Sequence, residues 1–250
     1  MKTYKIIVAY DGKRYHGWQI QPNDITIAQK LQDSFRSAFK KDIKIIGASR
    51  TDSGVHALGQ VAKFQINFNI NPNILLKSWN SILPQDILIR SLNHVDNNFH
   101  PQASVKEKTY YYNFCLKKPN PLISNYVYWI KQYRDNLIDL DKLNNALQVF
   151  IGTQDFRSFC TGQEHKSTIK TIDSIKLVYL KRYQIYQIQF KGQSFLRYMI
   201  RRIAGACLYA ANSSKINVQN LKIALKNKDP EQNLLTAPAN GLILRKIIYY

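Results

Sequence analysis

The chain has 250 residues, enough to bury roughly 70 to 75% of its unfolded surface, so one large domain or two small ones can form without disulfides. Its 36 Lys and Arg against 16 Asp and Glu give a formal net charge of +20, which favours a polyanionic partner such as a nucleic acid. Three scattered cysteines and no apolar run of roughly 18 to 20 residues argue against a disulfide framework, a zinc knuckle and a membrane span, and predict a soluble protein of the reducing cytoplasm.

The first hundred residues alternate between strand and helix patterns. An apolar alternation opens the chain and ends at the Asp11-Gly12 turn, and Thr26 with Gln29 forms a capping-box pattern before a helical stripe. Pro72 is placed to begin a second helix. The predicted elements are strands over 4–10, 43–46, 61–68 and 87–95, and helices over 27–39 and 72–83.

The second half repeats this mixture. The patterns predict strands over 108–116 and 242–249, a hairpin of 172–180 with 183–190, and helices over 140–150, 193–211 and 218–227. Both halves therefore read as α+β, and the seam near residue 104 predicts subdomains over 1–104 and 105–250.

Asp52 stands out because it lies in a polar loop of a chain with few acids. An aspartate among Gly, Ser and Thr is by default a turn former. Here Arg50 can pair with the carboxylate, Gly54 allows a ligand to approach the backbone, and the following strand would hold the loop rigidly. The histidines show no ligand-like spacing, so no metal site is predicted. His56 is interpreted as a structural histidine.

Two further clusters could bind RNA. On a strand, Lys108, Tyr110 and Tyr112 share one face while Tyr111 points to the other. Core packing is the better explanation for two of the three tyrosines, and a base could stack on the remaining ring beside a phosphate-binding lysine. Arg197 and Arg201 are four residues apart and line one face of the predicted helix. Like charges at that spacing repel, so we expect a partner, either a carboxylate such as Asp52 or RNA phosphate.

At these residues the chain resembles the tRNA pseudouridine synthase A (TruA) family over almost its whole length. The matching blocks are Tyr10-Asp11-Gly12 with Gly17-Trp18-Gln19, Arg50 to Ala57, Lys108 to Tyr112, Phe195 to Gly205 and Ala237 to Leu244. The resemblance implies two similar ferredoxin-like α+β subdomains with a shared antiparallel sheet and a central basic cleft. It also implies a homodimer that binds tRNA and isomerises uridines 38, 39 and 40 of the anticodon stem-loop, without a cofactor.

The resemblance also implies roles for single residues. Asp52 corresponds to the catalytic aspartate, Tyr110 to the ring that stacks on the uracil, and Arg201 to the arginine near the carboxylate. Arg50 corresponds to a loop arginine that meets RNA, and Leu244 to an apolar residue of the active site. Gln102 stands where the family usually has arginine, which removes one expected phosphate contact.

Two other functions fit the residues. A non-catalytic RNA-binding protein or tRNA chaperone would need the same charge and tyrosines but not Asp52. A nuclease would need a divalent metal.

Overall fold

The computed structural model describes residues 1–131, 138–162, 167–213, 216–231 and 234–250. The chain divides into two compact units: Met1–Lys106 with Ile243–Tyr250, called unit 1, and Glu107–Leu242, called unit 2. Both units combine helices with mostly antiparallel strands, so the predicted α+β class is confirmed. The predicted subdomain boundary at residue 104, the shared sheet and the central cleft stay predictions.

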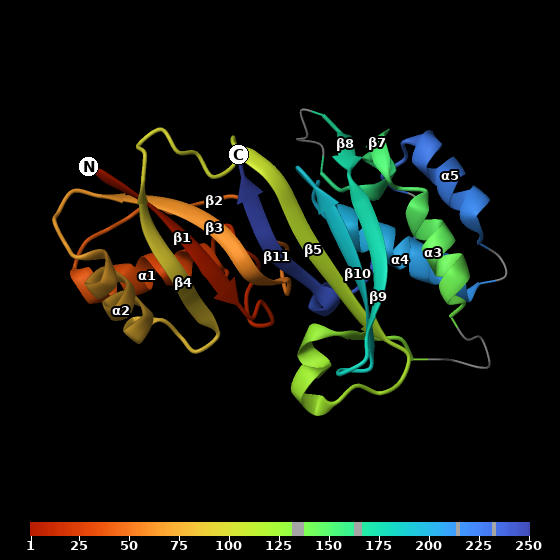
Figure 1. Cartoon of the computed structure of the whole chain (residues 1–250), viewed down its shortest axis with the longest axis horizontal. Coiled ribbons are helices and arrows are strands. Elements are labelled where there is room, and N and C mark those ends of the chain that lie inside the picture. The colour runs from red at the N-terminus through yellow and green to blue at the C-terminus, as the bar shows by residue number, and fades with distance from the viewer. Residues whose placement is uncertain (132–137, 163–166, 214–215, 232–233) are drawn as a thin grey trace. The chain divides into compact units, whose positions relative to one another are not determined.

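Four main strands form the sheet of unit 1. They are β1 (Lys2–Tyr10), β3 (His56–Ile66), β4 (Ile87–Val95) and β11 (Leu242–Tyr249), in the order β4-β1-β3-β11 (Figure 1). β1 is antiparallel to both of its neighbours, whereas β11 runs parallel to β3 and pairs Ile243 with His56. The short strand β2 (Ile46–Gly47) also pairs with β3. The Asp52 loop therefore connects β2 to β3, a strand with neighbours on both sides.

Helices α1 (Ile27–Phe39) and α2 (Pro72–Ile82) build the core of unit 1 around aromatic rings. Trp79 packs edge-on against Phe35 and Phe64, with ring centroids 4.9 and 5.1 Å apart. The Trp79 indole N–H donates to Ser34 Oγ at 2.9 Å. Because these large side chains are buried and their geometry is fixed, they hold the sheet that carries the Asp52 loop.

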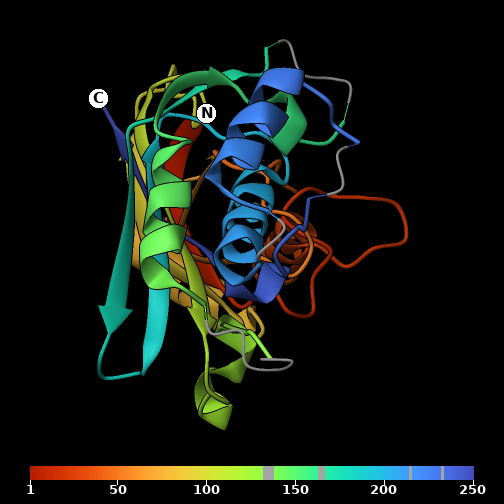
Figure 2. The same cartoon turned by 90° about the vertical axis from the view of Figure 1, so that its right-hand side faces the viewer.

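Unit 2 contains three antiparallel strands in the order β5-β10-β9. Its strands are β5 (Val105–Cys115), β9 (Ser174–Leu180) and β10 (Ile185–Gly192), and its helices are α3 (Leu140–Gln148), α4 (Met199–Asn212) and α5 (Val218–Asn227). β9 and β10 form the predicted hairpin, and Phe190 of β10 pairs with Tyr110 of β5. Figure 2 shows the three helices on one side of β9 and β10. None of the helices described is both long and apolar enough to cross a membrane.

Helix α4 begins six residues later than its sequence pattern predicts. The expected helix covered 193–211, but α4 begins at Met199 and ends at Asn212. Tyr198 precedes it with a φ of +62°, a left-handed conformation that cannot continue a right-handed helix. Arg197 therefore lies outside the helix, and the expectation that Arg197 and Arg201 share a helix face is wrong.

Short elements of unit 2 were also missed. β7 (Gly152–Asp155) and β8 (Ile169–Ile172) form a two-stranded antiparallel sheet, and β6 (Tyr128–Trp129) adds to β5 in parallel. The described residues of the unit also form the 3-10 helices η1 (Pro121–Tyr126), η2 (Arg157–Phe159) and η3 (Ala239–Gly241). The β7 sequence, Gly-Thr-Gln-Asp, has no apolar alternation from which a strand could be predicted.

The side chain of Thr26 does not form the predicted capping box at the start of α1. Thr26 is the N-cap of α1, as expected, but its side chain makes no capping hydrogen bond. Thr26 Oγ1 is buried and finds no hydrogen-bond partner among the residues described. The boundary is instead set by main-chain contacts, since Ile27 N donates to Gly17 O at 3.1 Å.

Candidate active site

Asp52 lies in a tight turn between β2 and β3. Val55 N donates to Asp52 O at 3.1 Å, and Gly54 takes a φ of +76° that closes the turn. Asp52 itself is partly exposed, whereas Val55 and His56, three and four residues later, are buried. The turn thus presents one carboxylate at the surface of unit 1 on a backbone fixed by the first residues of β3.

The segment between β1 and α1 holds this turn from the other side. Trp18 N donates to Thr51 O at 3.1 Å, and Gly54 N donates to Tyr15 O at 3.2 Å. The hydroxyls of Tyr10 and Thr51 are 2.8 Å apart and buried. Hydrogen bonds therefore fix the residue before Asp52 and the residue two positions after it, which limits the positions available to the carboxylate.

Gly17 is required where this segment touches the Asp52 turn. Its φ is +87°, and a Cβ at this position would lie 2.5 Å from Thr51 O and 3.2 Å from the Asp52 carbonyl carbon. We therefore expect Gly17→Ala to lower the melting temperature through about 1 to 3 kcal/mol of backbone strain. We also expect it to lower kcat, because the Asp52 turn must move to relieve the contact. Thermal unfolding and steady-state kinetics measure the two effects.

Gly152→Ala is the matched control for this prediction. Gly152 has a φ of +100°, but a Cβ there would have no atom within 4 Å. Gly152→Ala introduces backbone strain without a steric contact to the Asp52 turn, so we expect it to lower the melting temperature and to keep the wild-type kcat. If both variants kept full kcat, Gly17 would have no part in placing the Asp52 turn.

His56 is buried and hydrogen-bonded, in agreement with its interpretation as a structural histidine. Its side chain is 3% exposed, and its Nδ1 accepts a hydrogen bond from Gly12 N at 3.0 Å. Asp11 Oδ1 lies 3.0 Å from the same nitrogen. His56 thereby ties the Asp11-Gly12 turn to the start of β3.

Two glutamines fix the chain where it enters the Asp52 loop. The Gln60 side chain accepts from Ser49 N at 3.2 Å and donates to Ser49 O at 2.6 Å. Gln102 Nε2 donates to Gly47 O at 3.0 Å, so the residue that departs from the family pattern has a structural contact in this chain. Sequence reasoning missed the supporting role of Gln60, because no local pattern indicates a bond across eleven residues.

Arg50 and Leu244 take different positions in unit 1. Arg50 is exposed, and its expected pairing with the Asp52 carboxylate stays a prediction. An exposed arginine of this kind can still meet a phosphate. Leu244 is 0% exposed and lies in β11 opposite Ala57, five residues after Asp52.

Tyr110 lies in β5 of unit 2 and is nearly buried. It pairs with Phe190, and its ring makes an edge contact with Phe195 at a centroid distance of 5.3 Å. Lys108, two residues earlier on the same face, pairs with Gly192, and burial lowers its pKa to about 8. Burial also raises the pKa of Tyr112, whose hydroxyl donates to Pro238 O at 3.0 Å. Tyr112 is thus a core residue.

Arg201 is half-buried in the first turn of α4. Its Nε donates to Ala237 O at 2.9 Å, while Ala237 N donates to Arg201 O at the same distance. Its guanidinium also lies 4.8 Å from the centre of the Tyr198 ring. These contacts fix the direction of the Arg201 side chain.

The chemistry available to unit 1 follows from the Asp52 carboxylate on its supported turn. A partly exposed aspartate on a rigid turn can attack a sugar carbon as a nucleophile or remove a proton as a base. The comparable residues of unit 2 are a ring, Tyr110, and a cation held in place, Arg201. The residues described contain no group of three or more His, Cys, Asp or Glu side chains that could hold a metal ion.

A family model and the curated relatives of the chain lead to one family. A family model described as "tRNA pseudouridine synthase" matches residues 6–102 and 146–250. The chain is 36% identical to the "tRNA pseudouridine synthase A" of Thermodesulfovibrio yellowstonii, with both chains fully covered. The proteins of that name from Thermoanaerobacter pseudethanolicus and Limosilactobacillus reuteri are 37% and 38% identical, over all of this chain and 100% and 97% of theirs.

Proposed function

The chain belongs to the tRNA pseudouridine synthase family, whose members are isomerases, and we propose that it converts uridine to pseudouridine at positions 38, 39 and 40 of the anticodon stem-loop. The observation that carries this proposal is the supported turn that presents Asp52. The family model covers this turn, and a merely structural loop would not need a partly exposed carboxylate fixed on both sides.

Asp52 is the catalytic residue of the proposed reaction. The N-glycosidic bond between uracil N1 and the sugar breaks, the base turns, and a carbon bond forms between uracil C5 and the same sugar carbon. The C5 proton is released to solvent and N1 takes up a proton in its place, so the product is an isomer of the substrate and no oxidant, reductant or cofactor is needed. One carboxylate suffices, either as a nucleophile toward the sugar or as a base at the neighbouring sugar carbon.

The other four residues are proposed to contact the substrate. A uridine must leave its stack before the reaction, which costs a few kcal/mol, so the extruded base needs apolar contacts. Tyr110 supplies a ring for the base and Leu244 an apolar contact. Arg201 and Arg50 supply positive charge, the first held in place by Ala237 and the second exposed to backbone phosphate.

The proposal also covers the cellular compartment, the oligomeric state and the binding partner that the family resemblance implies. We expect a cytoplasmic homodimer that binds tRNA. The net charge of +20 supports a nucleic acid as the partner, because Lys and Arg neutralise backbone phosphates and release the counterions bound to them.

Three tRNA transcripts test the proposed positions. Each carries one uridine among positions 38, 39 and 40 and cytidine at the other two. After incubation with the protein, we expect pseudouridine at the single uridine of each transcript, located by chemical mapping. Modification confined to another arm of the tRNA would contradict the proposed site while leaving the chemistry intact.

A further inference from the structure

Five cations gather at one end of unit 2. This basic edge consists of Lys117, Lys118, Lys131, Lys181 and Arg182, all exposed. The two segments that carry them, 108–131 and 174–192, contain no Asp or Glu. None of the five forms an ion pair with another residue in the described ranges. Uncompensated charge of one sign on a short stretch of surface favours an anionic partner.

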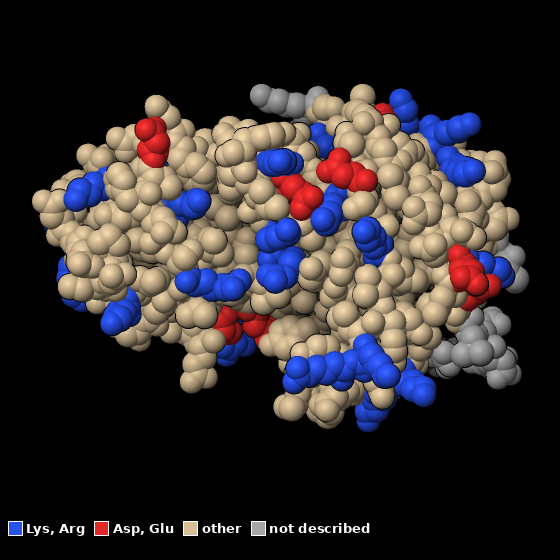
Figure 3. All heavy atoms as spheres, viewed as in Figure 1, with Lys and Arg blue, Asp and Glu red and all other residues tan. Residues whose placement is uncertain are grey.

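Strand pairing brings these side chains together. Tyr186 pairs with Phe114, so the β9–β10 turn follows beside the residues after β5. On the other side, Trp129 pairs with Cys115 and Ile130 N donates to Cys115 O at 3.0 Å, which places Lys131 beside Lys117. Figure 3 shows a row of blue side chains over this end of the unit.

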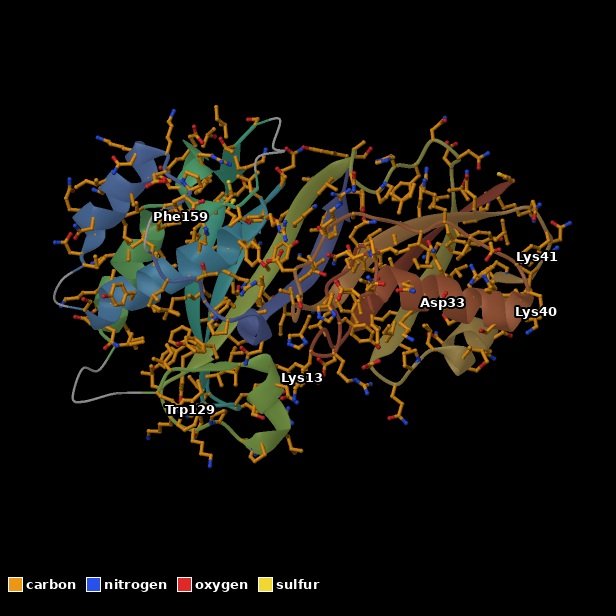
Figure 4. The ribbon with its side chains drawn as sticks, turned by 180° about the vertical axis from the view of Figure 1, so that it is seen from behind. Lys13, Asp33, Lys40, Lys41, Trp129 and Phe159 are labelled. Carbon is orange, nitrogen blue, oxygen red and sulfur yellow. The ribbon has the colours of Figure 1, made fainter. Side chains whose placement is uncertain are left out.

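The basic edge also offers aromatic rings next to its cations. Tyr183 is 50% exposed, with the Arg182 guanidinium 5.8 Å from its ring centre. Lys131 Nζ lies 5.4 Å from the ring of Trp129, which Figure 4 labels. Cations for phosphates beside rings for bases form the combination with which proteins bind RNA without reading its sequence.

The basic edge is distant from the ring proposed to contact the target base. Cys115 lies five positions after Tyr110 on β5, and at ~3.3 Å per residue the strand ends roughly 17 Å from Tyr110. The cations lie beyond that end. RNA bound there is remote from the reacting uridine, so the basic edge affects how tightly RNA is held and not the chemical step.

We propose that the basic edge is a second contact surface for the phosphate backbone of the tRNA substrate, remote from the target uridine. This inference rests on the proposed function, since tRNA is the anion that the enzyme must bind. Each phosphate contact of a lysine or arginine contributes about one unit to the dependence of log Kd on log salt concentration.

The test compares the wild type with the triple variant Lys117→Gln, Lys118→Gln, Arg182→Gln. Binding of an unmodified tRNA transcript is measured from 50 to 200 mM salt, and kcat is measured at saturating tRNA. We expect Kd to rise roughly tenfold or more, the salt slope to fall by about two to three, and kcat to stay unchanged. The matched control is Lys41→Gln, Lys222→Gln, Lys226→Gln, which removes the same charge from exposed sites on or near α1 and α5.

Three outcomes would overturn the proposal. The first is a triple variant whose Kd for tRNA and whose salt slope equal those of the wild type. The second is an equal loss of tRNA affinity in the control variant, which would show that the effect depends only on net charge. The third is binding of the wild type, but not of the triple variant, to phosphatidylserine vesicles while both bind tRNA equally, which would assign the edge to a membrane surface. A wild type that binds tRNA but forms no pseudouridine would contradict the proposed function, and the Kd comparison would still decide the basic edge.

Discussion

Asp52→Asn should abolish isomerisation and leave tRNA binding unchanged. Asparagine has the same shape and fits the same turn, but it is neither a nucleophile toward the sugar nor a base at neutral pH. Loss of such a group lowers kcat by at least about a thousandfold. Single-turnover formation of pseudouridine measures the loss, and filter binding of the same tRNA measures the affinity.

Asp33→Asn makes the same chemical change at a site without a proposed role. Asp33 lies on α1, where Figure 4 labels it, and forms an i,i+3 pair with Arg36 at 3.7 Å. We expect this variant to keep wild-type kcat, because such surface pairs contribute little to stability. A kcat for Asp52→Asn within tenfold of the wild type would show that another group performs the chemistry.

Tyr110→Ala should give the second largest loss. Stacking of a base on an aromatic ring is worth about 1 to 3 kcal/mol, which corresponds to roughly 5- to 150-fold in kcat/KM. Tyr110→Phe keeps the ring and its edge contact with Phe195, so it should keep most of the activity. Steady-state kinetics of both variants separates the contribution of the ring from that of the hydroxyl.

Tyr111→Ala is the control on the same strand. Tyr111 is half-buried and pairs with Gln189, on the face of β5 opposite Tyr110. Its loss should change stability more than kcat/KM. Equal losses of kcat/KM in Tyr110→Ala and Tyr111→Ala would contradict a specific role for the Tyr110 ring, and an inactive Tyr110→Phe would assign that role to the hydroxyl.

Elements with a local signal could be predicted from the sequence. Helix α2 begins at Pro72, as expected from the fixed φ of proline, and ends two residues before Pro84. The strand predicted over 242–249 is β11, with the same bounds. In both cases the residues that set the boundary are next to it in the chain.

Elements set by distant contacts could not be predicted. The left-handed Tyr198 that delays α4 has no sequence signature, since non-glycine residues rarely adopt that conformation. The polar strands β7 and β8 exist because they pair with each other, which neither segment indicates alone. The run predicted as a strand over 43–46 pairs with β3 only at its last residue, Ile46, and at Gly47.

The candidate site likewise contains one residue that its local sequence indicates and several whose contacts depend on the fold. Asp52 could be singled out because its loop combines an acid with glycine and small residues in a basic chain. The groups that support its loop include Gln60 of β3 and Tyr10 of β1, which contacts Thr51, and their contacts depend on the fold. Gly17 was part of a matching block, but its contact with Thr51 O depends on the fold as well.

Tritium release is the measurement that tests the central claim most directly. Unmodified tRNA with tritium at C5 of uridine is incubated with the wild type in the presence of a chelator, beside Asp52→Asn. The proposed isomerisation predicts that the wild type alone releases tritium, and that the modified uridines map to the anticodon stem-loop. Tight tRNA binding by the wild type without any release of tritium would contradict it, and would leave an RNA-binding protein without this chemistry.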